Sequence, residues 1–276
     1  ERENGLDCGD PNKEDAMERE IVELDIRYAK EIRVPYPECD IHNHWKLSYI
    51  MRAVQQIASD QLDDLGMTFI KLYSEGYVFL LSREYLEFHQ GITAGERVTI
   101  STWPLPPKGA QFRRNVAIDS GDGQRLMSGY TSWLLVNPES HKILRPASFP
   151  YVLRYGPVNG EDSMEEQITS LKAPAVVNGT AGESLRVAYS NSDCNGHLNN
   201  AVYGDLVLDS VPFGVWEKCR PTAFFIHFIK EAKLGAAVSA AVERAGEQWN
   251  FSGTSRPAGA MKEENCFQAF LKLTDL

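Results

Sequence analysis

The chain has 276 residues, 43% of them hydrophobic and 10% aromatic, a composition that predicts a globular protein with a sizeable core. A net charge of −10 at pH 7 and a pI of about 5.2 argue against binding to nucleic acid or to anionic membranes. No apolar run reaches the roughly 18 residues of a membrane span, so no membrane-spanning helix is expected. Five scattered cysteines without CxxC spacing argue against a disulfide framework or a zinc finger and favour a reducing compartment.

The first part of the chain is acidic and lacks the apolar stretch of a secretory signal, so we expect a disordered acidic extension over 1–18. Residues 47–65 predict an amphipathic helix, because apolar side chains recur there at three- and four-residue steps before Gly66. Strands are predicted beyond it over 77–88, 96–105, 110–119 and 124–137, the last two joined by the turn SGDG.

The sequence then repeats itself. Residues 32–50, IRVPYPECDIHNHWKLSYI, align without a gap with residues 185–203, LRVAYSNSDCNGHLNNAVY. Five identities share one offset of 153, since 193 − 40 = 153, and together they indicate two related halves. The identical pairs are Arg33 and Arg186, Val34 and Val187, Tyr36 and Tyr189, Asp40 and Asp193, and His44 and His197.

The second half continues as the first does. A helix that is apolar nearly all round is predicted over 199–211 and stops at Pro212. Strands are predicted over 222–232, 236–245, 248–253 and 264–276. Each half is therefore α+β, with one central helix wrapped by a curved antiparallel sheet. We expect a first domain over 19–150, a Pro- and Gly-containing linker over 151–183 and a second domain over 184–276.

The stretch NSDCNGHLNN, residues 191–200, holds the densest set of reactive side chains. Asp193, Asn195 and His197 alternate, so an extended run would point all three to one side. Asn199 or Asn200 can cap the following helix, whose free N–H groups form a positive pole. Such a pole can hold a carbonyl oxygen on which negative charge develops, as acyl transfer requires.

A water-activating base is expected from a neighbouring strand, and Glu231 is the candidate. It ends the apolar run AFFIHFIK, where burial would raise its pKa toward the range useful to a general base. Lys230 and Lys233 would partly offset that rise. The first half has His42 and Lys46 where the second has Asn195 and Asn199, a difference that suggests that only one half is catalytic.

Three other readings compete with this one. Cys194 could act as a nucleophile with His197 as its base, although the alternation points it away and favours a buried, inert thiol. Asp40, His42 and His44 could share a metal, but no further ligand cluster accompanies them, so neither a metal nor a cofactor is expected. Aromatic residues on the first-half strands could line an acyl tunnel or simply form core; they are Phe79, Phe88, Trp103 and Trp133.

Two segments together resemble the acyl-[acyl-carrier-protein] thioesterases of plants and bacteria: YSNSDCNGHLNNAVYGDLVLDSV at 189–211 and FIHFIKEAKLG at 225–235. The first half resembles the family's N-terminal domain over YVFLLSREYLEFHQGITAGERVTISTWPLPPKGAQFRRNVAI and SGYTSWLLVNPESHKILRP. The resemblance runs from about residue 17 to the C-terminus. It implies two tandem hotdog domains, of which the first accommodates the acyl chain and the second is catalytic.

The resemblance also implies the site. The family's catalytic Asp, Asn and His match Asp193, Asn195 and His197, and its Glu matches Glu231. Many plant members have a Cys after that Glu, where this chain has Ala232. Glu231 would activate water while Asn195 and His197 orient it or stabilise the oxyanion. Asp193 would either hold its neighbours or attack covalently to form an anhydride, and the sequence leaves both routes open.

The implied activity is hydrolysis of the thioester of fatty acyl-[acyl-carrier-protein], which releases free fatty acid. The implied partner is acyl carrier protein, with a homodimer also conceivable. The implied location is the cytoplasm, or the plastid stroma for a plant protein without its transit peptide. A hotdog acyl-CoA thioesterase, a 3-hydroxyacyl-thioester dehydratase and a non-catalytic acyl-binding module are the alternatives.

Overall fold

The computed structural model describes residues 20–22, 27–153, 155 and 171–276, so the extension expected over 1–18 lies outside the described residues. The first half contains β1 (Glu20–Val22), β2 (Tyr28–Arg33), α1 (Leu47–Asp64), α2 (Phe69–Ser74), β3 (Val78–Phe88), β4 (Arg97–Lys108), β5 (Gln111–Ser120), β6 (Arg125–Val136), β7 (Ile143–Leu144) and β8 (Tyr151–Leu153). The second half contains β9 (Thr180–Arg186), α4 (Asn200–Asp209), α5 (Phe213–Trp216), β10 (Cys219–Phe228), β11 (Ala237–Ala245), β12 (Gln248–Arg256) and β13 (Glu264–Asp275).

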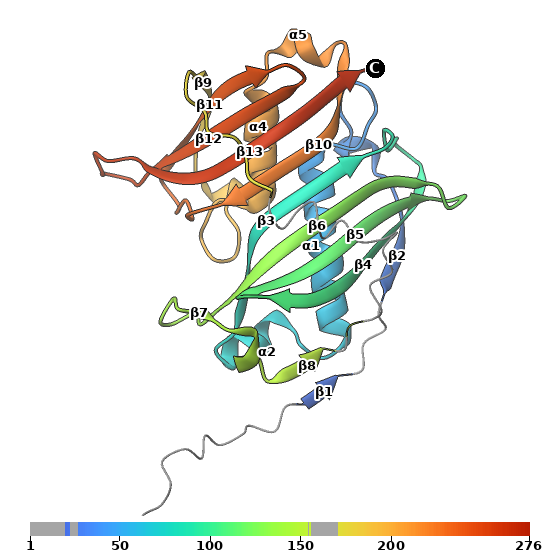
Figure 1. Ribbon diagram of the computed structural model, residues 1–276, viewed down its shortest axis with the longest axis vertical. Coiled ribbons are helices and arrows are strands. Elements are labelled where there is room, and N and C mark those ends of the chain that lie inside the picture. The colour runs from blue at the N-terminus through green and yellow to red at the C-terminus, as the bar shows by residue number, and fades with distance from the viewer. Residues whose placement is uncertain (1–19, 23–26, 154, 156–170) are drawn as a thin grey trace, which may run out of the picture.

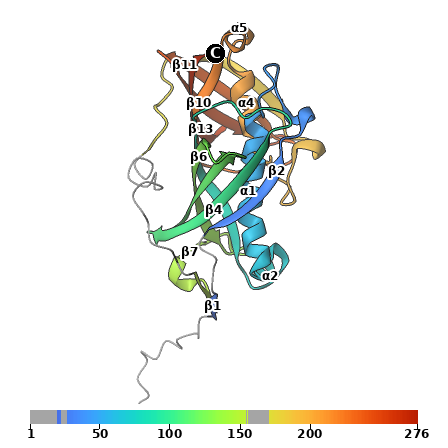
Figure 2. The same cartoon turned by 90° about the vertical axis from the view of Figure 1, so that its right-hand side faces the viewer.

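Both halves contribute to one continuous sheet. Its strand order is β2-β4-β5-β6-β3-β10-β13-β12-β11-β9, with β7 paired to β6, while β1 and β8 form a separate parallel pair. Figure 1 shows the first-half strands below and the second-half strands above, with α1 and α4 behind them. Figure 2 shows that the two helices lie on the same face of the sheet. The predicted α+β architecture, a helix against a curved antiparallel sheet in each half, is confirmed.

The sequence pattern explains the helices. The apolar stripe of α1 is buried, with Ile50, Met51 and Val54 each no more than 2% exposed. The chain leaves the helix through Gly66, whose φ of +73° favours glycine. Burial of α4 likewise explains its weak periodicity, because it packs against both the sheet and α1.

An approximate two-fold axis relates the halves and passes through the seam between them. On the sheet, β3 and β10 align at an offset of 140, because their bulges begin at Leu81 and Pro221 (221 − 81 = 140). Tyr85 of β3 pairs with Phe225 of β10, and these two positions correspond at that offset. On the helices, a Cβ on Gly204 would lie 2.7 Å from the Met51 sulfur, and these positions correspond because 204 − 51 = 153. The absence of a side chain at Gly204 therefore lets the two central helices come into close contact.

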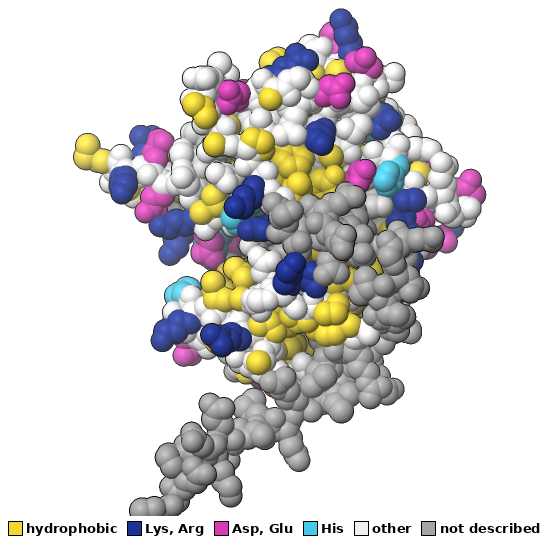
Figure 3. Space-filling model, viewed as in Figure 1, with side chains coloured by type: hydrophobic (Ala, Val, Ile, Leu, Met, Phe, Trp, Pro, Cys, Tyr) yellow, Lys and Arg dark blue, Asp and Glu magenta, His cyan; other side chains and the backbone are white. Residues whose placement is uncertain are grey.

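The outer face of the seam is apolar and carries part of the connection between the halves. Leu171 and Ala173 pack there on Phe225 and Phe270, and Figure 3 shows hydrophobic side chains gathered on this face. The segment 151–183, expected to be a linker, contains β8 and the first four residues of β9, so its two ends belong to paired strands.

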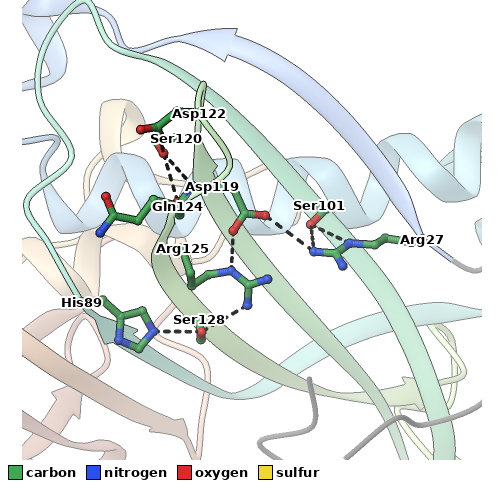
Figure 4. A network of polar contacts seen from close by, with 9 residues as sticks. All are labelled: Arg27, His89, Ser101, Asp119, Ser120, Asp122, Gln124, Arg125 and Ser128. Carbon is green, nitrogen blue, oxygen red and sulfur yellow. Dashed lines mark hydrogen bonds and ion pairs between the residues drawn. The ribbon is translucent and has the colours of Figure 1, made fainter. Parts of the chain in front are cut away.

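A polar network joins β4, β5 and β6 on the sheet face away from α1 (Figure 4). Asp119 lies at its centre, 2.5 Å from Arg125 Nε and 3.6 Å from Arg27 Nη2. Arg27 also donates to the Ser101 hydroxyl at 3.0 Å and covers the Trp103 ring. The network includes no predicted site residue, and it holds together the outside of the first-half sheet.

One carboxyl group on the inner side of the seam is unusual. Glu84 of β3 is fully buried between Thr131 of β6 and Ile226 of β10. Neither of its carboxyl oxygens has a hydrogen-bond partner among the described residues. Burial raises the pKa of Glu84 to about 8, because a low dielectric disfavours the charged form. The side chain is therefore mainly protonated and neutral at pH 7.

Glu84→Gln is expected to remove a pH-dependent loss of stability. Between the ordinary glutamate pKa of 4.5 and about 8, the folded protein holds a proton that the unfolded chain has released, so the free energy of unfolding falls as pH rises. The variant has no such proton and should match wild type near pH 5 but exceed it by a few kcal/mol at pH 8.5, at about 1.4 kcal/mol per pKa unit. Urea unfolding at both pH values measures the difference.

Glu87→Gln is the matched control, because Glu87 lies on the same strand and is partly exposed. It removes the same formal charge without touching the buried carboxyl. A stability difference between Glu84→Gln and wild type that stays constant with pH would contradict the assignment.

Candidate active site

The predicted site loop is a tight turn rather than an extended run. The Asp193 N–H donates to the His197 carbonyl at 2.8 Å, and the Gly196 N–H donates to the Asp193 carbonyl at 3.1 Å. Gly196 has a φ of +75°, a left-handed conformation that reverses the chain. The expectation that Asp193, Asn195 and His197 alternate along an extended segment is therefore wrong, and the turn sets their directions.

The Asp193 carboxylate organises this turn. Its Oδ1 accepts the backbone N–H groups of Asn195 at 2.9 Å and of His197 at 3.1 Å. The first half has the same arrangement, where Asp40 Oδ1 accepts the N–H groups of His42 and His44, each at 2.9 Å. The repeat seen in the sequence is thus a hydrogen-bonded unit that occurs twice, and its aspartate positions the backbone in both copies.

A second loop brings Glu231 to His197. Backbone pairing joins the two loops, since the Leu198 N–H donates to the Ala232 carbonyl at 2.8 Å and His197 forms a bridge with Lys233. His197 Nε2 lies 3.2 Å from Glu231 Oε2. The structure thereby brings together two predicted residues that are 34 positions apart in the chain (231 − 197 = 34).

The expectation that Glu231 is buried is wrong. Its side chain is 44% exposed, compared with 21% for His197. The reason is that β10 ends at Phe228, so Glu231 lies in the loop beyond the apolar strand and not within it. Water can therefore reach the carboxylate.

The start of α4 lies directly after this turn. Asn199 is its N-cap, and its Oδ1 accepts the Ala201 N–H at 3.0 Å, as the sequence predicts for one of the two asparagines. The positive end of the helix therefore points toward the turn that carries His197. Asn195 is exposed, and its side-chain amide has no hydrogen bond to a described residue, which leaves it free to bind a ligand.

The first half lacks the acid, a difference that the sequence comparison missed. Beyond the central strands the halves correspond at an offset of 140, as Gly95 and Gly235 show with φ values of +79° and +87°. This offset aligns Glu231 with Gly91, since 231 − 91 = 140. A Cβ at Gly91 would lie 2.4 Å from His44 Nε2, so the imidazole fills the space that a side chain would need. Aligning FHQGITAG with FIKEAKLG would have revealed the substitution.

Two alternative sites find no support in the described residues. The Cys194 side chain is exposed, contrary to the expected buried thiol, and makes no hydrogen bond to a described residue. Asp40 uses Oδ1 for backbone N–H groups, and the rings of His42 and His44 lie 6.4 Å apart. Within the part of the chain that the structure describes, no group of three His, Cys, Asp or Glu side chains could hold a metal ion.

A cavity of about 910 Å³, including the space at its mouth, lies in the first half between the helices and the sheet. Phe79 and Trp133 line it, whereas Phe88 lines a different cavity and Trp103 packs on the outer face. Its other apolar lining residues include Ala58, Leu62, Met67, Leu72, Leu105 and Phe112. The space suits an aliphatic group.

The fold and the site define a class of protein: one chain with two helix-and-sheet halves, of which one carries a His–carboxylate pair at a helix N-terminus. Residues 25–147 match the acyl-ACP thioesterase N-terminal domain, and residues 177–266 match the acyl-ACP thioesterase C-terminal domain. The chain belongs to the acyl-ACP thioesterase family, and its halves are hotdog domains.

Relatives and solved structures agree with this assignment. A palmitoyl-acyl carrier protein thioesterase of Arabidopsis thaliana, named as chloroplastic, is 22% identical over 225 residues, which cover 76% of this chain and 53% of the relative. The chain thus spans about half the length of the curated relatives it matches.

Two solved structures share the fold. An acyl-ACP thioesterase from Bacteroides thetaiotaomicron has a TM-score of 0.72 and 17% identity, with 90% of this chain and 98% of that chain covered. The 12:0-ACP thioesterase from Umbellularia californica has a TM-score of 0.75 and 13% identity, with 91% and 98% covered. None of the helices in the described ranges is both long and apolar enough to cross a membrane.

Asp40→Ala and Asp193→Ala are expected to lower the free energy of unfolding by similar amounts. Each removes a carboxylate that accepts two backbone N–H groups, and a lost hydrogen bond to a charged group corresponds to about 1.5–3 kcal/mol. Denaturant unfolding of both variants measures the change. If one variant matched wild type and the other lost several kcal/mol, the structural equivalence of the two turns would be wrong.

Proposed function

We propose that the protein hydrolyses the thioester of a fatty acyl chain carried on acyl carrier protein, which releases the free fatty acid. The observation that carries this proposal is the pair of His197 and Glu231 beside the N-terminus of α4. The corresponding histidine of the first half, His44, faces Gly91, so the second hotdog, expected over 184–276, is the catalytic half. Family membership supports the same activity.

The arrangement suits direct attack by water. His197 donates its Nε2–H to Glu231 Oε2 and so orients the carboxylate. Glu231 accepts a proton from water as the water oxygen bonds to the thioester carbon. The carbonyl oxygen becomes negative and lies near the Asn195 amide and the positive end of α4. The carbon–sulfur bond then breaks, and the leaving thiolate takes the proton.

Asp193 acts in this proposal as a positioning residue. Its Oδ1 is occupied by two backbone N–H groups, and Asp40 does the same in a half without the acid. Because the aspartate makes the same contacts in both copies, its presence is explained by the turn that both copies share and does not require a catalytic role. This favours water attack over the anhydride route.

The acyl chain is proposed to enter the apolar cavity of the first hotdog, expected over 19–150. Phe79 and Trp133, two of the four aromatic residues that suggested an acyl tunnel, line the cavity. Arg114, which is buried at its wall, donates to Thr102 Oγ1 at 3.2 Å and to Gln61 Oε1. These hydrogen bonds direct the Arg114 guanidinium toward Thr102 and Gln61, so that apolar side chains remain to contact the acyl chain.

Acyl carrier protein is the proposed partner. Exposed Lys233 flanks the site and offers a local positive charge in a chain whose net charge is −10. We propose the bacterial cytoplasm or the plastid stroma as the location, since the curated relatives are named as chloroplastic. A homodimer is also proposed, and light scattering would measure it.

His197→Ala and Glu231→Gln should each reduce hydrolysis of dodecanoyl-[acyl-carrier-protein] by about 10²–10⁴-fold, the usual contribution of general acid–base groups. The reason is that each removes one partner of the pair that activates water. Thiol release from the carrier protein measures the rate, and circular dichroism checks that both variants are folded.

Glu217→Gln serves as the control, because Glu217 is an exposed carboxylate of the same half. It should keep the wild-type rate. Enoyl product instead of free thiol would indicate a dehydratase, and tight acyl binding without turnover a binding module. A faster reaction with acyl-CoA than with acyl carrier protein would revise the partner.

Single turnover in ¹⁸O-labelled water tests for an anhydride that opens at the aspartyl carbonyl. Direct attack places the label in the released fatty acid and none in the protein. An anhydride opened by attack at the aspartyl carbonyl places label in the Asp193 carboxylate, which mass spectrometry of the peptide containing residue 193 detects. Label in that peptide would exclude direct attack as the sole route.

A further inference from the structure

The first-half copy of the turn borders a second cavity, separate from the acyl cavity. His44 and Lys46 line it from the turn, Ile50 from α1 and Phe88 from the end of β3. The second half closes it with Leu208 of α4 and Arg220 of β10. The cavity measures about 510 Å³ including the open space at its mouth. It occupies the place related by the two-fold axis to the proposed catalytic site.

Comparison of the two places shows that their charged groups lie on different residues. Gly91 replaces Glu231, which removes an acid, and Lys46 replaces Asn199, which adds a cation. Arg220 corresponds to Leu80, because both strands have a bulge at equivalent positions, between Leu81 and Arg83 in β3 and between Pro221 and Ala223 in β10. The first copy therefore has cations on its turn and on the strand across the seam, Lys46 and Arg220, whereas the second copy has Lys230 and Lys233 beside its acid.

These cations form no ion pair within the described part of the protein, and the Lys46 ammonium lies 5.9 Å from the centre of the Tyr49 ring. Asp40 also lines the cavity and contributes one negative charge, with its Oδ1 held by two backbone N–H groups. The start of α1 has no side-chain cap, so its positive end adds to the same field.

We infer that this cavity binds an aliphatic carboxylate, held by Lys46 and Arg220 with its chain against Ile50, Phe88 and Leu208. Guanidinium and ammonium groups are the usual partners of a carboxylate, and the apolar wall accounts for the chain. A carboxylate has no thioester bond to break, so this is proposed as a binding site and not as a second reaction site. That the ligand is the released fatty acid rests on the proposed function, whereas the binding itself does not.

The test uses decanoate and the indole N–H signal of Trp45 in ¹H–¹⁵N NMR spectra of the full chain. The Trp45 ring lines the cavity and its Nε1–H donates to Glu38 at 2.9 Å, so its signal reports on this site, and Trp45→Phe assigns it. Decanoate should shift the signal to saturation. Decanol, which has the chain without the charge, should bind at least tenfold more weakly.

Lys46→Gln combined with Arg220→Gln should weaken decanoate binding at least tenfold. Lys108→Gln combined with Lys262→Gln removes the same charge from exposed positions and should leave the affinity unchanged. If the first double variant perturbs the spectrum beyond the cavity, the two single substitutions replace it, each with an expected loss of at least threefold.

Equal binding of decanoate by wild type and the Lys46/Arg220 variant would overturn the inference, as would equal binding of decanol and decanoate or no shift of the Trp45 signal. No thioester is present in the titration. A negative result in this titration therefore does not contradict the proposed hydrolase activity. Likewise, a negative result in the hydrolase assay does not affect the titration.

Discussion

The antiparallel pairing of β3 with β10 is the contact on which the remaining structure depends. It joins two half-sheets into one and places the central helices together on one face. Each helix then lies against its own half-sheet and against the other helix, so neither half buries its apolar surface alone. Gly204 permits this arrangement, because a larger residue would push the Met51 side chain out of the helix contact.

The same pairing determines where chemistry can occur. The two-fold axis relates two equivalent places, each formed by a turn, a helix start and the loop beyond the seam strand of the same half. The turn is stabilised by an aspartate in both copies, so its geometry does not by itself provide catalysis. The residue that faces the histidine differs between the copies, Glu231 in one and Gly91 in the other. In the proposed mechanism this difference, together with Asn195 and Asn199 in place of His42 and Lys46, separates the catalytic copy from the other.

Much of this architecture could be predicted from the sequence. The three- and four-residue steps of α1 and the alternating strands reflect burial on one face, which leaves a direct mark on residue order. The 153-residue offset revealed the repeat because the turn needs its aspartate and its histidine backbone in both halves. The residue pattern pointed to the four candidate residues and the resemblance assigned them roles, and the structure brings His197 and Glu231 together.

Other features could not be predicted from the sequence, because they depend on the tertiary structure. An alternating pattern of Asp193, Asn195 and His197 looked extended, but the positive φ of Gly196 converts it into a turn. Glu231 followed an apolar run and looked buried, yet the strand ends three residues earlier. Glu84 gave no signal at all, because a glutamate among polar neighbours in SREYLEF reads as a solvent-facing residue until the strand order places it at the seam.

The covalent connection between the halves has a further consequence. In an assembly of two identical hotdog chains, the residue facing one histidine must also face the other, because both are encoded by the same codon. A single chain with both halves has separate codons for positions 91 and 231. The absence of the acid at one position, and the different placement of cations around it, could therefore arise without any change at the other.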